Sequence, residues 1–392
     1  MTEQASRVAL YANVGPELTH YDVDVDAATL ARRDSVILPA NVQYVWPHAS
    51  REFVYVATSD SASGMGAAGN THHVSAFRID PASGALSPHG APIPLPARPI
   101  HMATDVPSRN ILVAFNNPGA VRIYRINPDG TAGAEVTQSP NVNPGIFPHQ
   151  VLASLDNRLI ILVARGHDAD SARPEEPGAL MVFRNNDGVL EDQAIVAPEG
   201  GYGFGPRHLD FHPTRPWIYV SLERQNAVDM FVRNGDALEA SPRFRVNTLS
   251  GPANPAHRQV VGTVHVHPNG RFVYVANRAA DTVDFNGRKV FVGGENSIAV
   301  FAIDPATGQP TVIQHADTNG IHPRTFHIDP TGRLMVVAHI MGLPVRVGDT
   351  VEQVPMRLSL FRIADDGKLD FVRSYDVDAN GKTMWWMGMV GL

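Results

Sequence analysis

The chain has 392 residues, a formal net charge of −7 and no cysteine, which excludes disulfides, thiolate metal ligands and cysteine nucleophiles. Lysine and arginine form no continuous stripe, and the apolar runs are shorter than the roughly 20 residues of a membrane helix, so neither a nucleic acid nor a membrane is expected as a partner. The N-terminal residues lack the pattern of a secretion signal. We therefore expect a soluble, cytoplasmic protein with a small-molecule partner. The composition does not indicate whether the protein is a monomer or an oligomer.

Seven copies of a hairpin pattern follow one another along the chain. Each consists of an aromatic residue, a short apolar run and a turn containing Asp, Asn or Gly, as in "AFRIDPASGAL" and "VFAIDPATGQP". The copies lie 47 to 70 residues apart, close to the length of a four-stranded propeller blade. The pattern predicts an all-β fold, a seven-bladed β-propeller of four-stranded antiparallel blades, as one domain over residues 1–392. The aromatic anchors are Tyr21, Phe77, Tyr124, Phe183, Phe231, Phe301 and Phe361.

The two ends of the chain are expected to share one blade. The first apolar run, "VALYANV", reads as the second strand of a blade, and the C-terminal "TMWWMGMVGL" is left to supply the first strand. Pairing these two strands closes the ring and leaves no unpaired edge. Trp385 and Trp386 are expected to be core and closure residues.

Turns of the form "HP-x-x-R" and "DP-x-G-R" join the first two strands of several blades. His212, His267 and Asp329 begin such turns, so we expect them to cap the turns. The candidate catalytic residues are then expected on the opposite face of the propeller. His208 is expected on the alternate face of its strand, as a buried, hydrogen-bonded histidine.

Aligning the blades with one another places two columns of residues on that opposite face. One column lies where the first strands begin and comprises Gln43, His101, His149, Arg207, Gly262 and Arg324. The other lies where the second strands end and comprises Val14, Ser59, Asn117, Arg165, Glu223, Arg278 and Ile340. We expect His149, Glu223, Arg207 and Arg324 to be catalytic, and His101, Arg165, Arg278 and Gln43 to bind substrate.

These residue types suit acid/base chemistry on an anionic or carbonyl-bearing substrate. Arginine binds a carboxylate, a phosphate or a developing oxyanion, and imidazole moves protons near neutral pH. His149 would activate water or protonate a leaving oxygen, and Glu223 would orient it or act as the base itself. The competing interpretation is that Glu223, Arg165 and Arg278 form ordinary ion pairs between blades. His101, His149, His167 and His339 show no compact ligand spacing, so no metal or other cofactor is expected.

Long insertions fall between the second and third strands of several blades, on the face of the candidate site. They are "SGMGAAGN", "RGHDADSARPEEPG", "RAADTVDFNGRKVFVGGEN" and "IMGLPVRVGDTVEQVPMR". Loops at this position are expected to form walls of a pocket.

Motifs along nearly the whole chain resemble the lactonase family of seven-bladed propellers, which includes bacterial 6-phosphogluconolactonases and fungal 3-carboxy-cis,cis-muconate lactonizing enzymes. They include "FPHQ", "GPRHLDFHP" with "YVSLERQNAVDMF", "HPNGRFVYVANR", "HPRTFHIDPTGR" and "MWWMGMV". The resemblance implies a metal-independent site with His149, Arg207, Glu223 and Arg324 at the matching positions. We expect a hydrolase acting on an anionic, sugar-acid or carboxylated lactone. The alternatives are a cycloisomerase that lactonizes a cis,cis-muconate-type dicarboxylate and a non-catalytic binding propeller.

Overall fold

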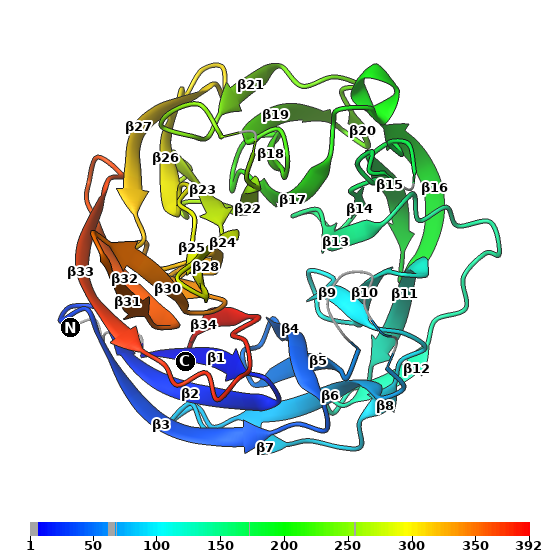
Figure 1. Ribbon diagram of the computed structural model, residues 1–392. Coiled ribbons are helices and arrows are strands. Elements are labelled where there is room, and N and C mark those ends of the chain that lie inside the picture. Colours follow the sequence, from blue (N-terminus) through cyan, green and yellow to red (C-terminus); the bar gives the residue numbers. More distant parts are fainter. Residues whose placement is uncertain (1–6, 62–66, 68, 172, 255) are drawn as a thin grey trace.

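The computed structural model describes residues 7–61, 67, 69–171, 173–254 and 256–392. Within these residues the strands form eight sheets, of which seven are antiparallel and arranged as blades around a central axis (Figure 1). The first strand of each blade lies next to the axis, and later strands lie progressively further out. The predicted seven-bladed β-propeller is therefore confirmed.

Apart from β34, the strands of the first four blades lie in the N-terminal half of the chain. The blade that contains the N-terminus has the order β34 (Met387–Gly391), β1 (Val8–Val14), β2 (Glu17–Asp24) and β3 (Thr29–Ile37). The second has β4 (Asn41–Pro47), β5 (Phe53–Ser59), β6 (His72–Ile79) and β7 (Leu86–Pro88), with β8 (Ile93–Pro94) also pairing with β6. The third has β9 (Pro99–Thr104), β10 (Asn110–Asn116), β11 (Gly119–Ile126) and β12 (Ala132–Glu135). The fourth has β13 (Pro148–Ala153), β14 (Leu159–Ala164), β15 (Ala179–Asn186) and β16 (Val189–Val196).

Three more blades complete the ring. After a short 3-10 turn, η1 (Pro198–Gly201), the fifth has β17 (Pro206–Phe211), β18 (Trp217–Leu222), β19 (Ala227–Asn234) and β20 (Ala237–Leu238), and β21 (Phe244–Asn247) also pairs with β19. The sixth has β22 (Gln259–Val266), β23 (Phe272–Ala279), β26 (Ser297–Ile303) and β27 (Pro310–Asp317). The seventh has β28 (Pro323–Ile328), β29 (Leu334–His339), β32 (Arg357–Ile363) and β33 (Leu369–Asp376).

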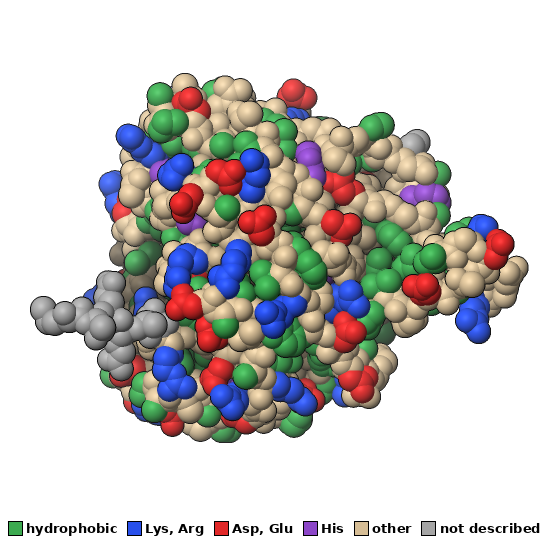
Figure 2. Space-filling view, turned by 90° about the vertical axis from the view of Figure 1, so that its left-hand side faces the viewer, with side chains coloured by type: hydrophobic (Ala, Val, Ile, Leu, Met, Phe, Trp, Pro, Cys, Tyr) green, Lys and Arg blue, Asp and Glu red, His purple; other side chains and the backbone are tan. Residues whose placement is uncertain are grey.

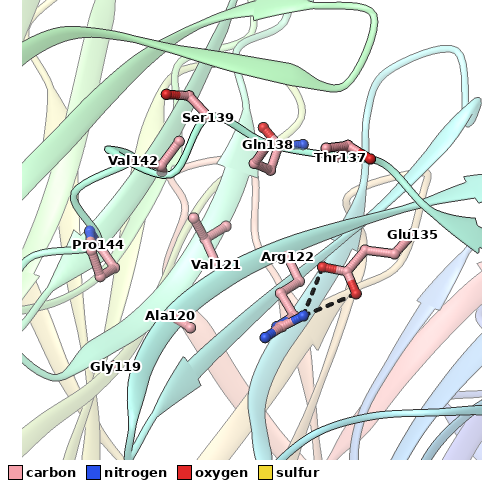
Figure 3. Close-up of a pocket in the computed structure, with 10 residues that line it drawn as sticks. All are labelled: Gly119, Ala120, Val121, Arg122, Glu135, Thr137, Gln138, Ser139, Val142 and Pro144. Atoms are coloured by element: carbon pink, nitrogen blue, oxygen red, sulfur yellow. Dashed lines mark hydrogen bonds and ion pairs between the residues drawn. The ribbon is translucent and has the colours of Figure 1, made fainter.

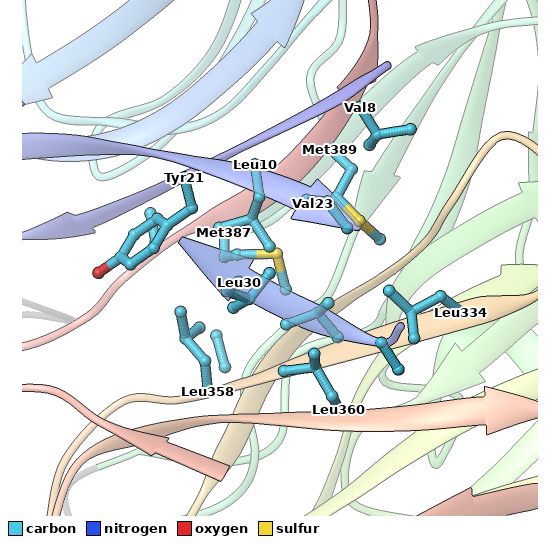
Figure 4. Close-up of a cluster of buried hydrophobic side chains, with 14 of the residues drawn as sticks. Val8, Leu10, Tyr21, Val23, Leu30, Leu334, Leu358, Leu360, Met387 and Met389 are labelled. Carbon is cyan, nitrogen blue, oxygen red and sulfur yellow. The ribbon is translucent and has the colours of Figure 1, made fainter. Parts of the chain in front are cut away.

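The ring closes by pairing of the two chain ends, as predicted. Strand β34 runs antiparallel to β1, with Met387 opposite Ala12 and Gly391 opposite Val8. Side chains of the closing blade then pack against the seventh blade, where Leu10 and Met387 share one buried cluster with Leu360 (Figure 4). Closure therefore rests on both a hydrogen-bonded ladder and an apolar contact between blades.

Histidine and aspartate side chains cap the turns between first and second strands. The Nδ1 atom of His212 accepts hydrogen bonds from the backbone N–H groups of Thr214 and Arg215, at 3.2 and 2.9 Å. Its Nε2 atom donates to the carbonyl of Gly270 at 2.8 Å, and His267 repeats both types of bond in the next blade. Asp329 accepts from the backbone of its own turn. The predicted turn-capping role of these three residues is confirmed.

Tyrosines tie neighbouring blades together on that same face. A buried tyrosine of the second strand donates its hydroxyl to the carbonyl of a glycine in the hairpin between the third and fourth strands of the next blade. The bond recurs four times, from Tyr11 to Gly84, Tyr55 to Gly130, Tyr219 to Gly308 and Tyr274 to Gly367, at 2.6 to 3.0 Å.

Two of the long insertions fold together into an additional sheet. The insertion after β23 forms β24 (Thr282–Phe285) and β25 (Arg288–Phe291), and the insertion after β29 forms β30 (Leu343–Val347) and β31 (Thr350–Val354). Strands β25 and β30 pair in parallel, with Phe291 opposite Val345. This pairing between the sixth and seventh blades was not predicted. The "SGMGAAGN" insertion lies largely outside the described residues.

The surface shows no segregation of charge on the face drawn in Figure 2, where acidic and basic side chains alternate. A lobe projects from the disc in this view. In the described part of the chain, no helix has the length and apolar character needed to cross a membrane.

Candidate active site

A β-bulge lies near the beginning of the first strand in several blades. In β17, Pro206 pairs with Leu222 and His208 pairs with Ser221, so Arg207 is the additional, unpaired residue. The same shift leaves Gln43, His149 and Arg324 unpaired in β4, β13 and β28. A bulge redirects the side chains beside it, and here it recurs at the predicted column.

The observed column differs from the predicted one at two blades. In β9, Ala114 pairs with His101 and Phe115 pairs with Pro99, so Ile100 rather than His101 occupies the bulge. Asn116, not Asn117, then ends the second strand of that blade. The prediction for His101 was shifted by one residue, since the turn hydrogen bonds align Asp105 with His212 and therefore Ile100 with Arg207.

The closing blade contributes Trp385 to this column. The N–H of Asn13 donates to the carbonyl of Trp386, and the N–H of Gly15 donates to that of Thr383. Since Glu223 makes the matching bond to Gly205, Trp385 takes the place that Arg207 holds in the fifth blade. The expectation of a closure role is correct for buried Trp386 and incomplete for Trp385, which lines a cavity.

Glu223 lies at the centre of a cluster of three arginines. Its Oε1 atom is 2.6 Å from Nη2 of Arg278 and 3.3 Å from Nε of Arg207, and its Oε2 atom pairs with Nη1 of Arg165. Arg207, with 1% of its surface exposed, is among the most buried side chains. The predicted proximity of Arg207 and Glu223 is confirmed, and the ion pairs of the competing interpretation are present.

The arginines determine the charge state of Glu223. Burial opposes ionisation of the carboxyl, but Arg165, Arg278 and Arg207 together hold its pKa well below the usual value. A carboxylate stabilised in this way is a weak base. Glu223 is therefore better suited to orienting the three guanidiniums than to accepting a proton.

The ring of His208 contacts two other histidine rings near this cluster. The ring centroid of His208 lies 5.2 Å from that of His149 and 5.8 Å from that of His101. The expected burial of His208 is confirmed, and the bulge at Arg207 directly precedes it in its strand. Burial and the charge of Arg207 hold the pKa values of all three rings well below 6.5.

A cavity of about 560 Å³ opens beside these residues. Of the predicted site residues, Gln43, Glu223, Arg278 and Arg324 line it. His149, Arg207, Arg165 and His101 do not line it. The described lining includes four arginines, Arg98, Arg258, Arg278 and Arg324, against two carboxylates, Glu223 and Asp281.

His322 and Arg98 are lining residues to which the sequence assigned no role. The Nε2 atom of His322 lies 3.0 Å from Nη1 of Arg278. Arginine can only donate, so Nε2 of His322 is the acceptor and the ring is neutral. Burial and Arg278 lower its pKa well below 6.5, in agreement with this assignment. Local patterns gave no signal for Arg98, because it lies in the connection between β8 and β9.

The two insertions that form the additional sheet also reach the cavity. Ala279, Ala280 and Asp281 line it at the start of the first insertion, and Ile340 and Met341 line it at the start of the second. The predicted contribution of these loops to a pocket wall is confirmed.

A second hollow lies away from this cluster, between β11, β12 and the chain that follows (Figure 3). Its charged residues, Arg122 and Glu135, form a partly exposed ion pair with each other at 2.8 Å. The candidate catalytic and substrate-binding residues that line a cavity therefore line the first cavity and not this second hollow. No group of three or more His, Asp or Glu suited to a metal ion occurs among the residues that the structure describes.

A model of the family described as "Lactonase, 7-bladed beta-propeller" matches residues 8–342. The chain belongs to this lactonase family. It is 26% identical over 349 residues to the 6-phosphogluconolactonase of Bacillus subtilis, covering 86% of this chain and 89% of that protein. It is 27% identical over 314 residues to the 6-phosphogluconolactonase of Cronobacter sakazakii, covering 79% and 80% of the two chains.

Solved structures share the fold of this lactonase-family propeller. A putative 6-phosphogluconolactonase from Bacteroides uniformis superposes with a TM-score of 0.74 at 20% identity, covering 98% of this chain and 100% of that one. A periplasmic gluconolactonase from Pseudomonas aeruginosa gives 0.71 at 20% identity, covering 98% and 99%. The cytoplasmic location expected for this member of the family stays a prediction.

Proposed function

We propose that the protein hydrolyses an anionic sugar-acid lactone in the cavity at the mouth of the central channel. The observation that carries the proposal is the excess of guanidinium over carboxylate around this cavity, with neutral histidines beside it. An anionic substrate is favoured there because its charge balances buried cations. The names of the relatives, which are lactone hydrolases, favour hydrolysis over the muconate alternative.

In the proposed reaction, water attacks the lactone carbonyl carbon and His149 takes a proton from it. The tetrahedral oxyanion is stabilised by Arg278, whose guanidinium lines the cavity and is held by Glu223 and His322. The bond from the carbonyl carbon to the ring oxygen then breaks, and His149 returns the proton to that oxygen. The product is the open-chain hydroxy acid.

His149 is supported as the base by its charge state, and it is not among the residues that line the cavity. A ring held neutral by burial and by Arg207 is ready to accept a proton at neutral pH. The Nδ1 atoms of His149 and His322 both lack a hydrogen-bond partner among the described residues, but Nε2 of His322, the nitrogen of that ring that can accept, is occupied by Arg278. Arg207 contributes through its contact with Glu223, and Arg324 binds the anionic part of the substrate.

The test is an assay of three compounds: glucono-1,5-lactone, its 6-phosphate and a carboxymuconate. Hydrolysis of each lactone is measured by the acid that it releases. We expect the wild type to hydrolyse a sugar lactone, His149→Asn and Arg207→Ala to lose most activity, and Arg122→Ala to keep it. Turnover of the muconate alone would instead support a cycloisomerase. A folded wild type that turns over none of the panel would support the binding-module alternative.

A further inference from the structure

Arg98 is a buried cation without a carboxylate partner. Only 5% of its surface is exposed, its Nε atom donates to Oε1 of Gln43 at 2.8 Å, and its Nη1 atom is buried without a hydrogen-bond partner. No Asp or Glu in the described part of the chain lies within ion-pair distance of it. Burial lowers its pKa to about 10. A guanidinium removed from water in this way is unfavourable unless a ligand supplies the missing charge.

Arg324 also has no carboxylate within ion-pair distance among the described residues, and it contacts the same aromatic ring as Arg98. Its Cζ atom is 3.5 Å from the ring centroid of Trp385, and Cζ of Arg98 is 5.4 Å from it. Its Nε atom donates to the carbonyl of Trp385 at 3.1 Å, and it forms no ion pair with a described residue. The indole attracts both cations through its quadrupole but carries no net negative charge.

The arginines that line the cavity differ in charge balance. Glu223 forms an ion pair with Arg278, and it also pairs with Arg165 and Arg207. Arg98 and Arg324 also line the cavity, as does Gln43, but neither arginine forms an ion pair with a carboxylate among the described residues. An anionic substituent gains most beside these two arginines.

We propose that Arg98, Arg324 and Trp385 form a subsite for an oxyanionic substituent of the substrate, a phosphate or a carboxylate, remote from the lactone carbonyl. The subsite deepens the proposed function by restricting the substrate to lactones that carry such a group. The expected effect on turnover rests on the proposed function, whereas the expected binding of the anion does not. Arg98 is thereby assigned as a specificity-determining residue.

Binding of inorganic phosphate, measured by calorimetry on the full chain, tests the subsite without any reaction. We expect the wild type and Arg122→Gln to bind phosphate alike, and Arg98→Gln to bind it about 10- to 100-fold more weakly, because a charge-assisted pair is lost. Arg98→Lys keeps the charge and should lose less. Equal binding by wild type and Arg98→Gln, or no binding by the wild type, would overturn the subsite even if lactones are hydrolysed.

Turnover distinguishes the two sources of the anion. Glucono-1,5-lactone, its 6-phosphate and its 6-carboxylate analogue are compared by kcat/KM, with thermal unfolding as the check on folding. We expect one of the charged lactones to be preferred by the wild type and this preference to fall about 10- to 100-fold in Arg98→Gln, mainly through KM. The preferred lactone identifies the substituent. A preference that is absent, or that survives Arg98→Gln unchanged, contradicts the assignment.

Discussion

The carboxylate of Glu223 lies 2.6 Å from Nη2 of Arg278, although the two residues belong to neighbouring blades. Together with Arg165 and Arg207 this pair joins three blades at the mouth of the channel. Removing the carboxylate leaves three buried guanidiniums without their shared partner. We expect Glu223→Gln to lower the free energy of unfolding by about 3–5 kcal/mol, measured by urea denaturation.

The matched control for this variant is Glu135→Gln, which removes the carboxylate of the partly exposed pair in Figure 3. Its cost should stay below about 1 kcal/mol, because solvent screens that pair. Equal effects of the two substitutions would show that the Glu223 cluster contributes no more than a surface pair does.

The choice of base can be read from pH profiles. His149→Asn should lower kcat by about 10²- to 10⁴-fold, the usual contribution of a general base. The acidic limb of the wild-type profile should lie below pH 6.5, because burial and Arg207 lower the pKa of His149. In Glu223→Gln this limb should remain in the profile of whatever activity is left, since Glu223 acts by positioning.

His322→Asn is the comparison for His149→Asn, since both rings are held neutral near the cavity. It should cost less activity and keep the acidic limb. If His322→Asn removes the limb and His149→Asn keeps it, the roles of the two residues are reversed.

Acid should destabilise the propeller through its buried histidines. Burial lowers the pKa of His339 from 6.5 to about 4, so the unfolded chain binds a proton there before the folded one does. This contribution is fully present above pH 6.5 and is lost as the pH falls toward 4, at a cost on the order of 3 kcal/mol. Urea unfolding of wild type and His339→Gln at several pH values measures it. A variant with the same pH dependence as wild type would refute the effect.

A single methyl group should disturb the contact between the fifth and sixth blades. Gly308 has a φ of +79°, and a Cβ atom there would lie 2.7 Å from the ring of Trp217. Gly308→Ala should lower the free energy of unfolding by about 2–4 kcal/mol, from backbone strain and overpacking. Gly235→Ala, at φ +63° with no described atom within 4 Å of its Cβ, should cost only about 1 kcal/mol.

Most of the fold follows from local sequence, because strand alternation and turn residues repeat in each blade. The seven hairpins and the closing strand were predicted for this reason. The additional sheet was not, since the pairing of Phe291 with Val345 joins two insertions whose sequences carry no signal for each other. Pairing between distant segments depends on how close the blades bring them.

The site residues were predicted correctly in those blades whose sequences align with one another without a shift. Arg207 and Glu223 were brought together by antiparallel strand order alone, and their contact is present. His101 was displaced by one residue because a proline sits one position later in its turn. The contacts of His208 with two histidines of other blades were not predicted, because alternation does not reveal a bulge, and Trp385 had no matching residue type in the other blades.

The tyrosine hydroxyls described above bond neighbouring blades on the face away from the cavity. Loops on the cavity face take no part in these bonds, so their length and sequence can diverge between relatives without loosening the ring. This division indicates where substrate range can be changed by design: exchange of the insertions after β23 and β29 should alter selectivity while the bonds that join the blades stay in place.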